Sequence, residues 1–474
     1  METVAHRSAP PAADVLQDLI AGLLGGAPPV RIRCWDGSEL GPPDSEVTIL
    51  VRSPDALRRL MWAPNELGLG RAYVAGDLDL DGDVYALLQL RDRLGDEAAG
   101  EQIHLDLGPK GWLRTVRAAR RLGLLGGPLP APAEEARLRG RRHDRQRDAA
   151  AIAHHYDVGN DFYRLVLGPS MTYSCAYFET PDRTLEQAQE AKYELVCRKL
   201  GLRPGMRLLD VGCGWGGMVL HAAQHHGVEA VGITLSSEQC DLARRRVEEA
   251  GLSDRVRIER RDYRDLRGGG FDAISSIGMF EHVGLDRLGE YFNDLRLLLR
   301  PGGRLLNHGI SRPPGRSRFE RRSFIERYVF PDGELHEVGT VVSAMQRQGF
   351  EVRDVESLRE HYARTLRAWV RNLEADWDVA QRLVGPPRAR IWRLYMAGSA
   401  VGFEAGRTSI HQVVAVRAHA DGRSDMPLTR HEFLHGVDRD AGADGTDADG
   451  DGDAVMDLTE TSAAADSLIS RPST

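Results

Sequence analysis

Apolar positions along the chain follow two different periods. From residue 201 onward, short apolar runs typical of buried strands alternate with segments whose apolar residues recur at helical spacing. This order predicts an α/β domain with a doubly wound, Rossmann-like sheet. Strands are expected at residues 207–211, 230–234, 256–260, 271–276, 304–308, 351–358 and 412–417, the last two as an antiparallel pair. Helices are expected at residues 217–226, 237–250, 286–299 and 335–348, and a mostly helical cap over the sheet at residues 361–405.

The N-terminal part of the chain has a looser pattern. Apolar residues recur at helical spacing over 14–24, and strands are expected at 30–34 and 47–51. A helix is expected to start with Ser53 as N-cap and Pro54 at its first position. The predicted organisation is a small α+β domain at 14–94, a connector at 95–150, the α/β domain at 151–418 and a tail at 436–474.

The net charge of the chain is confined to its end. The 474 residues include 62 Lys+Arg and 70 Asp+Glu, which gives a net charge of −8. Residues 436–474 contain ten acidic residues and two arginines, and therefore carry the same net charge of −8. The body of the chain is close to neutral, and the acidic tail is expected to be disordered.

Several protein classes are excluded by composition. No run approaches the roughly 18 apolar residues of a spanning helix, and no secretory signal is visible. The five cysteines form no C-x-x-C pair, which favours reduced thiols in a cytoplasmic protein over a disulfide frame or a zinc ribbon. No metal site is expected.

The connector at 95–150 is rich in arginine. Such a segment can contact an anionic membrane surface, or it can be a solvated linker in a protein that uses arginine as its main base. Nucleic acid is the weaker alternative, and none is expected as a partner. The arginines are Arg114, Arg117, Arg120, Arg121, Arg137, Arg139, Arg141, Arg142, Arg145 and Arg147.

A glycine-rich turn follows the first strand of the α/β domain. Asp210 precedes Gly212, Gly214 and Gly217, a spacing that allows a backbone to approach a ligand at a helix N-terminus. The glycines alone fit a dinucleotide or an S-adenosylmethionine (SAM) site. The second strand lacks the terminal acid that usually holds a ribose, and the following segment offers hydroxyls and an amide instead.

Longer motifs resemble the cyclopropane-fatty-acyl-phospholipid synthases, which are SAM-dependent methyltransferases related to the mycolic acid cyclopropane synthases. The resemblance covers about residues 30–415, including an N-terminal segment, GLGRAYVAGD at 68–77, that is similar to the extra domain of the full-length bacterial enzymes. The motifs are HYDVGNDFY at 155–163, MTYSCAYF at 171–178, TLSSEQ at 234–239, FEHVG at 280–284 and HYARTLRAW at 361–369.

The resemblance implies a class I SAM methyltransferase fold and a reaction on lipid. The methyl group of SAM would be added to a cis double bond, and a bound bicarbonate would then remove a proton so that a cyclopropane closes. Matching positions imply catalytic roles for Cys175, Glu281, His308 and Tyr362, with Ile310 joining them around bicarbonate. Ser311 replaces the usual glycine after Ile310. Taken singly, each polar residue also has a structural interpretation, such as a small buried thiol for Cys175.

The resemblance also implies the SAM-binding set and the partners. Unsaturated phospholipid acyl chains at a membrane surface are the expected substrate, reached through peripheral association, and a homodimer is possible. Two alternatives stay open: the same transfer giving a methyl- or methylene-branched fatty acid, and C-methylation of a soluble small molecule. The implied SAM-binding residues are Tyr173, Ser174, Asp210, Gly212, Gly214, Trp215, Gly216, Thr234, Ser236, Gln239, Asp262 and Tyr263, with Asp262 accepting from the adenine amine.

Overall fold

A computed structural model describes residues 11–24, 27–94, 126–136, 144–156, 158–314 and 323–435, with isolated positions between 113 and 142. The predicted tail at 436–474 and most of the arginine-rich connector lie outside the described residues. The division into an N-terminal domain and a larger α/β domain stays a prediction, although each part has its own sheet.

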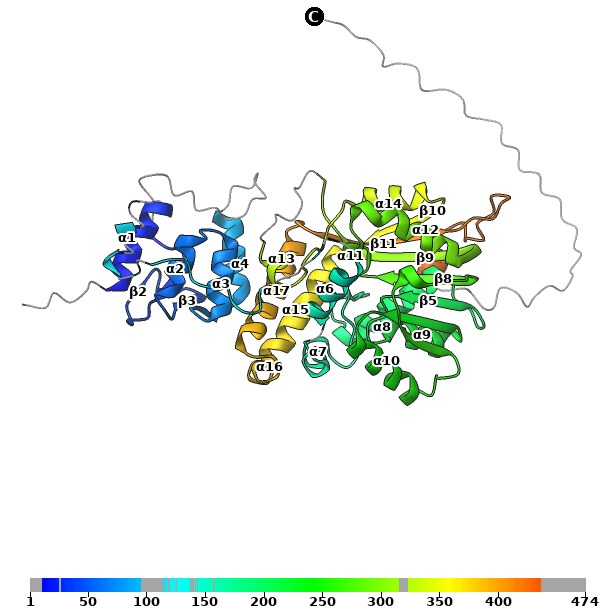
Figure 1. The fold of residues 1–474 in the computed structure, drawn as a ribbon, viewed down its shortest axis with the longest axis horizontal. Helices are drawn as coiled ribbons and strands as arrows, with labels where there is room; N and C mark the ends of the chain where they lie inside the picture. Colours follow the sequence, from blue (N-terminus) through cyan, green and yellow to red (C-terminus); the bar gives the residue numbers. More distant parts are fainter. Residues whose placement is uncertain are drawn as a thin grey trace, which may run out of the picture. The chain divides into compact units, whose positions relative to one another are not determined.

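The larger sheet has seven strands in the order β10-β11-β9-β8-β5-β6-β7 (Figure 1). The five strands from β9 to β7 run parallel. β11 pairs antiparallel with β9, and β10 pairs antiparallel with β11, so the last two strands form the predicted antiparallel pair. Parallel strands covered on both faces are the expected outcome for near-continuous apolar runs. The strands are β5 (Arg207–Val211), β6 (Glu229–Thr234), β7 (Val256–Arg260), β8 (Phe271–Ile277), β9 (Leu299–Ser311), β10 (Glu351–Ser357) and β11 (Ser409–Val416).

Helices cover both faces of this sheet. One face is covered by α8 (Leu185–Leu200), α9 (Gly217–His226) and α10 (Ser237–Glu249), and the other by α12 (Leu288–Leu298) and α14 (Val338–Arg347) (Figure 1). The start of α8 shows why such helices begin where they do: Thr184 and Gln187 form a capping box, and Gly201 ends the helix in the left-handed region. Short elements follow the strands: η1 (Tyr263–Asp265), α11 (Phe280–Val283), η2 (Leu285–Arg287) and α13 (Phe324–Tyr328).

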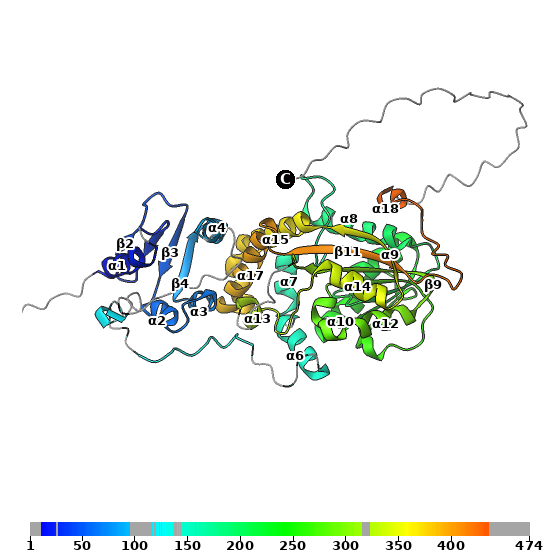
Figure 2. The same cartoon turned by 90° about the horizontal axis from the view of Figure 1, so that it is seen from above.

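A helical cap lies beyond the carboxyl edge of the strands, as the sequence predicts for residues 361–405. Its long helices α15 (Arg359–Ala375) and α17 (Pro386–Glu404) run side by side in both views (Figures 1 and 2). Buried Trp369 and Trp392 lie in the apolar cluster that joins these helices to the sheet. The remaining helices are α6 (Arg145–Tyr156), α7 (Asn160–Leu167), α16 (Trp377–Val384) and, after β11, α18 (His431–His435).

The N-terminal part forms a four-stranded sheet in the order β2-β1-β3-β4. The prediction of two strands here was incomplete, because β2 and β4 are short or partly polar and give weak alternation. The helix expected from Ser53 begins later: Pro54 is the N-cap, and Ser53 Oγ accepts from the Asp55 N–H at 3.1 Å. The elements are α1 (Ala12–Leu24), β1 (Arg31–Arg33), β2 (Glu39–Leu40), β3 (Val47–Val51), α2 (Asp55–Trp62), α3 (Glu66–Ala75), β4 (Leu78–Gly82) and α4 (Val84–Leu94).

Candidate active site

Distant site residues meet at the carboxyl edge of the parallel strands. The glycine turn follows β5, Thr234 ends β6, Asp262 follows β7 and Glu281 lies in α11 just after β8. Ile310 lies near the end of β9. Adjacent parallel strands present their carboxyl ends on one side, so the topology collects these segments as the sequence predicts.

The turn between β5 and α9 leaves room for a close backbone approach. The N–H groups of Gly212 and Cys213 donate to Ile233 O at 3.0 and 2.9 Å and fasten the turn to β6. A Cβ at Gly212 would lie 2.4 Å from Met279 Sδ, so any side chain there would have to displace Met279 and adopt a left-handed φ. The first N–H groups of α9 cannot be satisfied within the helix and can therefore bind a ligand. The turn glycines with positive φ are Gly212, Gly214 and Gly216.

A buried lysine, Lys192, lies near the carboxyl end of β5 and interacts with Ser174 and Asp210. Lys192 of α8 is 1% exposed and donates to Ser174 Oγ at 3.1 Å. Asp210 is also buried, and its Oδ1 accepts from Ser275 Oγ at 2.6 Å. Burial raises the pKa of Asp210 to about 6, although Ser275 and Lys192 act in the opposite direction. Burial lowers the pKa of Lys192 to about 7, and Asp210 opposes this shift. The charge states of the two groups are therefore linked.

The segment after β6 is held by its own side chains. Thr234 Oγ1 donates to Gln239 Oε1 at 2.7 Å, and Ser236 caps α10 by accepting from the Gln239 N–H at 3.3 Å. All three residues are buried. Trp215 of the glycine turn is also fixed, because its Nε1 donates to Asn160 Oδ1 at 2.8 Å.

Asp262 already has a cationic partner. Its Oδ1 and Oδ2 accept from the Arg264 guanidinium at 2.9 and 2.7 Å, and Arg264 also reaches Asp148 Oδ2 at 3.2 Å. Only the remaining lone pairs of Asp262 are open to the adenine amine expected there. The neighbouring Tyr263 packs edge-on against Tyr291, with ring centroids 4.9 Å apart.

Glu281 is a buried carboxyl with one oxygen engaged. Its Oε1 accepts from the Ile310 N–H at 2.7 Å. Its Oε2 is buried and accepts no hydrogen bond from the described part of the chain. Burial raises the pKa of Glu281 to about 7, against the lowering effect of the Ile310 N–H. The strand β9 thus holds one oxygen and leaves the other as a ready acceptor.

The tautomer of His308 is defined by the Gln412 amide, whose orientation is in turn fixed by the Lys199 amine. Lys199 Nζ donates to Gln412 Oε1 at 2.8 Å, so the amide nitrogen of Gln412 faces His308. That nitrogen lies 3.3 Å from His308 Nδ1, which must accept. The imidazole proton therefore lies on Nε2, which is buried and has no hydrogen-bond partner among the described residues. Burial lowers the pKa of His308 well below its ordinary value, so the ring is neutral.

Cys175 and Tyr362 are both buried at the cap. Cys175 Sγ donates to Leu358 O at 3.7 Å, and the next N–H, of Ala176, donates to Thr365 Oγ1 at 3.0 Å, which pins this segment to α15. Burial raises the pKa of the Cys175 thiol. Burial also raises the pKa of Tyr362, and nearby Tyr395, Cys175 and Glu281 add to this shift. Both side chains therefore stay protonated and neutral.

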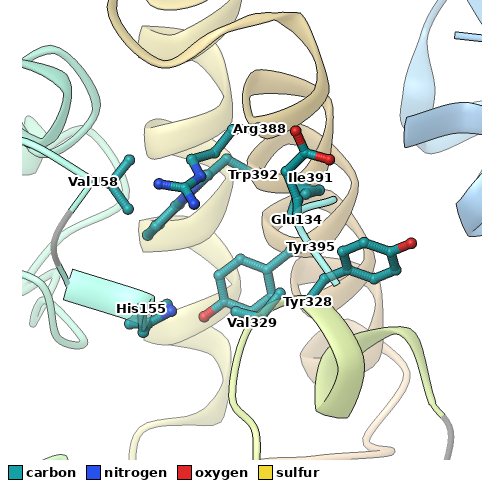
Figure 3. Close-up of a pocket in the computed structure, with 9 residues that line it drawn as sticks. All are labelled: Glu134, His155, Val158, Tyr328, Val329, Arg388, Ile391, Trp392 and Tyr395. Carbon is teal, nitrogen blue, oxygen red and sulfur yellow. The ribbon is translucent and has the colours of Figure 1, made fainter. Parts of the chain in front are cut away.

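An aromatic pocket adjoins the loop that carries Tyr173. The Tyr173 hydroxyl lies 3.1 Å from both His155 Nε2 and the Tyr395 hydroxyl. Figure 3 shows His155 and Tyr395 among the side chains around this small pocket, which is partly open to solvent. The lining residues are Glu134, His155, Val158, Tyr328, Val329, Arg388, Ile391, Trp392 and Tyr395.

Sequence reasoning missed four residues that organise the site: His155, Lys192, Tyr395 and Gln412. Lys192 had a signal, because the arginine-rich chain has only three lysines, Lys110, Lys192 and Lys199. Two of these lie buried on α8. His155 stands within a motif already noted, but Gln412 and Tyr395 lie in unremarkable strand and helix patterns.

The comparisons with known proteins now decide the family. Residues 143–413 match the family of mycolic acid cyclopropane synthetase. The chain belongs to this family. Over 414 residues it is 45% identical to a probable fatty acid methyltransferase of Mycobacterium tuberculosis (strain ATCC 25618 / H37Rv), which covers 85% of this chain and 94% of that protein.

Two further proteins are similar to this chain, one in sequence and one in solved structure. The cyclopropane-fatty-acyl-phospholipid synthase of Escherichia coli (strain K12) is 34% identical over 375 residues, covering 79% of this chain and 89% of its own. The solved mycolic acid cyclopropane synthase CmaA1, complexed with SAH and CTAB, has a TM-score of 0.53 and 35% identity over 56% of this chain and 97% of its own. The resemblance drawn from the sequence is confirmed: this family member is a SAM-dependent methyltransferase with a Rossmann-like fold.

Proposed function

We propose that the enzyme transfers a methylene group from SAM to the cis double bond of an unsaturated phospholipid acyl chain and forms a cyclopropane. The observation that carries this proposal is a pair of buried polar atoms left open beside Ile310. Glu281 Oε2 is an acceptor, and His308 Nε2–H is a donor. Burying polar atoms without hydrogen-bond partners costs free energy, so these two atoms favour the binding of a small polar ligand between them.

Bicarbonate fits this set of donors and acceptor. Its hydroxyl can donate to Glu281, and its charged oxygens can accept from His308 and from the protonated Tyr362. When bound, bicarbonate supplies a base for the proton lost from the transferred methyl group. Glu281 would orient that ion through an oxygen that is fixed by the Ile310 N–H.

The site residues also suit a reaction that develops positive charge on a lipid chain. Burial keeps the Cys175 thiol and Tyr362 phenol neutral, so neither is a strong nucleophile toward a cation. The surrounding apolar cluster excludes water. Aromatic rings stabilise nearby positive charge, and the ring centroids of Trp369 and Tyr173 lie 5.2 Å apart in this part of the site.

The SAM site is proposed at the glycine turn. Asp210, the turn backbone and the segment from Thr234 to Gln239 would hold the cofactor, with Asp262 and Tyr263 beside its adenine. Ser174 and Tyr173 would approach its reactive end from the cap side. The proposed path for the acyl chain runs past the cap aromatics beside Tyr173, since the Trp392 ring packs against Tyr173 and the Tyr395 hydroxyl contacts it.

Access to the substrate is proposed to be peripheral. No helix in the described ranges is long and apolar enough to cross a bilayer. Val15 and Leu16 are buried, and Arg142, Arg145 and Arg147 already form ion pairs with Asp332 or Asp265. The exposed connector arginines Arg117, Arg120 and Arg121 are therefore the proposed contacts with anionic lipid. Sedimentation with anionic and neutral vesicles at low and high salt tests this: binding that ignores both lipid charge and salt would refute the electrostatic part.

The reaction itself is tested with deuterated SAM. Purified protein is incubated with methyl-deuterated SAM, bicarbonate and dioleoyl phosphatidylglycerol vesicles, and the fatty acid methyl esters are analysed by mass spectrometry. The proposal expects a gain of one CD2 unit in a product that resists mild hydrogenation, because it has a ring in place of a double bond. Product formation should fall when bicarbonate is removed.

A second candidate is a methylene- or methyl-branched fatty acid. It is favoured by the 45% identity to a protein named a probable fatty acid methyltransferase. A labelled product that takes up hydrogen readily, or that appears only with a reductant, would replace the cyclopropane proposal. Bound SAM without any labelled lipid would point to a soluble substrate.

A further inference from the structure

Three metal-ligating side chains, Cys197, His221 and His226, meet between α8 and α9, outside the site described above, and Glu194 contacts both imidazoles. Glu194 and Cys197 lie one turn apart on α8, while His221 and His226 lie on α9. The ligand atoms of Cys197, His221 and His226 all lie within 4.8 Å of one another. Glu194 Oε2 lies 3.4 Å from His221 Nε2 and 2.9 Å from His226 Nε2.

We propose that Glu194, Cys197, His221 and His226 bind one zinc ion that fastens α8 to α9. The donor set is one thiolate, one carboxylate and two neutral imidazoles, which are the ligands that zinc takes in proteins. The two anionic ligands balance the charge of a divalent zinc ion. This is a site that the cysteine spacing did not reveal, because its ligands come from two separate helices.

The separations suit tetrahedral coordination. Zinc bonds of about 2.0–2.3 Å place ligand atoms roughly 3.3–3.7 Å apart in a tetrahedron. The Glu194–His distances of 2.9 and 3.4 Å are close to this range, and thiol–imidazole separations within 4.8 Å reach it by a small side-chain rotation. Glu194 lies outside the group of three ligand atoms that are mutually within 4.8 Å, so its carboxylate would have to turn toward the thiol to complete the four-ligand sphere of a structural zinc site.

The surroundings prepare the ligands. Arg198 Nε lies 3.2 Å from Glu194 Oε1, the oxygen that does not face the imidazoles, in an ion pair that leaves Oε2 to the two histidines. Cys197 is fully buried, whereas His221 and His226 are 10% and 16% exposed, so an ion could enter from the solvent side. Without a metal, the imidazoles would hydrogen-bond Glu194 and Cys197 would be a small apolar core residue; the proposal rests on the thiol lying within 4.8 Å of both imidazoles.

The proposed ion would support the SAM end of the molecule. α9 starts directly after the glycine turn, and α8 carries Lys192, which contacts Ser174. The Tyr193 hydroxyl would lie 2.1 Å from a Cβ at Gly217, so the two helices already pack tightly at the start of α9. A zinc ion bound near the C-terminal end of α9 would join α8 and α9 at a second point.

The test uses the full chain without a histidine tag. Metal content is measured as isolated, and metal-stripped protein is titrated with Zn²⁺ and with Co²⁺. We expect one equivalent of zinc per chain, and with Co²⁺ the sulfur-to-metal charge-transfer band and visible absorption of a tetrahedral site. Zinc should also raise the melting temperature of the stripped protein.

Matched variants assign the ligands. Cys197→Ser and His226→Asn should lose the cobalt spectrum and bind zinc at least about 10-fold more weakly. Cys240→Ser and His225→Asn are the controls, since the first removes another buried thiol and the second an exposed neighbouring imidazole; both should keep the spectrum. Glu194→Gln lies on the more exposed side of the cluster and tests the site if a buried variant fails to fold.

Two results would overturn the proposal. One is wild-type protein that binds no stoichiometric zinc at micromolar concentration. The other is Cys197→Ser protein that keeps both the full zinc content and the sulfur charge-transfer band. The readouts are independent of lipid chemistry, so they stand whatever product the enzyme makes.

Discussion

The amide nitrogen of Gln412 lies 3.3 Å from Nδ1 of His308, on the neighbouring strand. Lys199 holds the other end of the same amide and so prevents it from flipping. This pair places the imidazole proton on Nε2 and turns His308 into a donor toward the site. Gln412 is therefore a positioning residue in the proposed reaction, acting through His308.

Changing Gln412 to glutamate should reverse this tautomer. A carboxylate at this position would accept from Nδ1–H, so Nε2 would lose its proton and could no longer donate to bicarbonate. We expect the bicarbonate concentration for half-maximal rate to rise at least about 10-fold, the loss of one buried charge-assisted hydrogen bond. SAM affinity should stay unchanged.

The matched variant Gln412→Leu leaves the histidine free to choose its tautomer, and a smaller effect is expected. Steady-state rates against bicarbonate and SAM distinguish the two. A Gln412→Glu enzyme with a wild-type bicarbonate response would show that His308 does not donate through Nε2.

Replacing Glu281 with glutamine should separate chemistry from binding. The amide oxygen can still accept from the Ile310 N–H, but the second oxygen becomes a donor. Product formation is expected to fall roughly 100-fold, as for loss of one preorganised group. Calorimetry should find SAM affinity within about 2-fold of wild type, and the melting temperature should not drop, because the variant buries no ionisable carboxyl. Equal losses of SAM binding and rate would contradict this role.

SAM affinity should depend on the charge of Asp210. Burial raises the pKa of this carboxyl from its ordinary value to about 6, so it is ionised above that pH and becomes protonated as the pH falls through about 6. If the carboxylate binds SAM, affinity is lost on the acid side. Titrations of SAM binding by calorimetry between pH 5 and 8 measure the midpoint.

The neighbouring lysine sets where this transition falls. The positive charge of Lys192 lowers the pKa of Asp210, so Lys192→Met should move the acid midpoint of SAM binding upward, by about one unit or more. Asp262→Asn, away from this pair, serves as the control and should leave the midpoint in place. An unchanged midpoint in the Lys192→Met protein would show that the two groups are not coupled.

A methyl group added at the glycine turn should be damaging at one position and mild at another. Gly212→Ala combines a φ of +79° with a contact of 2.4 Å to Met279, and should destabilise the protein by about 2–4 kcal/mol. Gly214→Ala also has positive φ, but its added Cβ meets nothing within 4 Å. It should cost only about 1–2 kcal/mol.

Urea unfolding without SAM measures this difference. The double variant Gly212→Ala with Met279→Ala should recover part of the loss by removing the clash. Equal destabilisation by the two single alanine variants would mean that backbone strain, and not Met279, decides the residue at Gly212.

Local pattern was enough for most of the α/β domain. The strands β5 and β7 coincide with the predicted 207–211 and 256–260, because turns and charged residues border their apolar runs sharply. β9 is longer than the predicted 304–308, since its pairing with β11 continues to Ser311. In the N-terminal part, β2 has only two residues, and such a strand exists only through its partner β1.

The sequence by itself determined the fold class, the glycine turn and the family, because these depend on residues close together in the chain. The tertiary structure decided the proton on His308, which depends on Gln412 from 104 residues away, and the free oxygen of Glu281, whose other oxygen is held by β9. It also decided the meeting of Glu194 and Cys197 with two histidines of the next helix. The reason is physical: short-range periodicity specifies which face of an element is buried, whereas strand register and helix packing specify which polar side chains meet there.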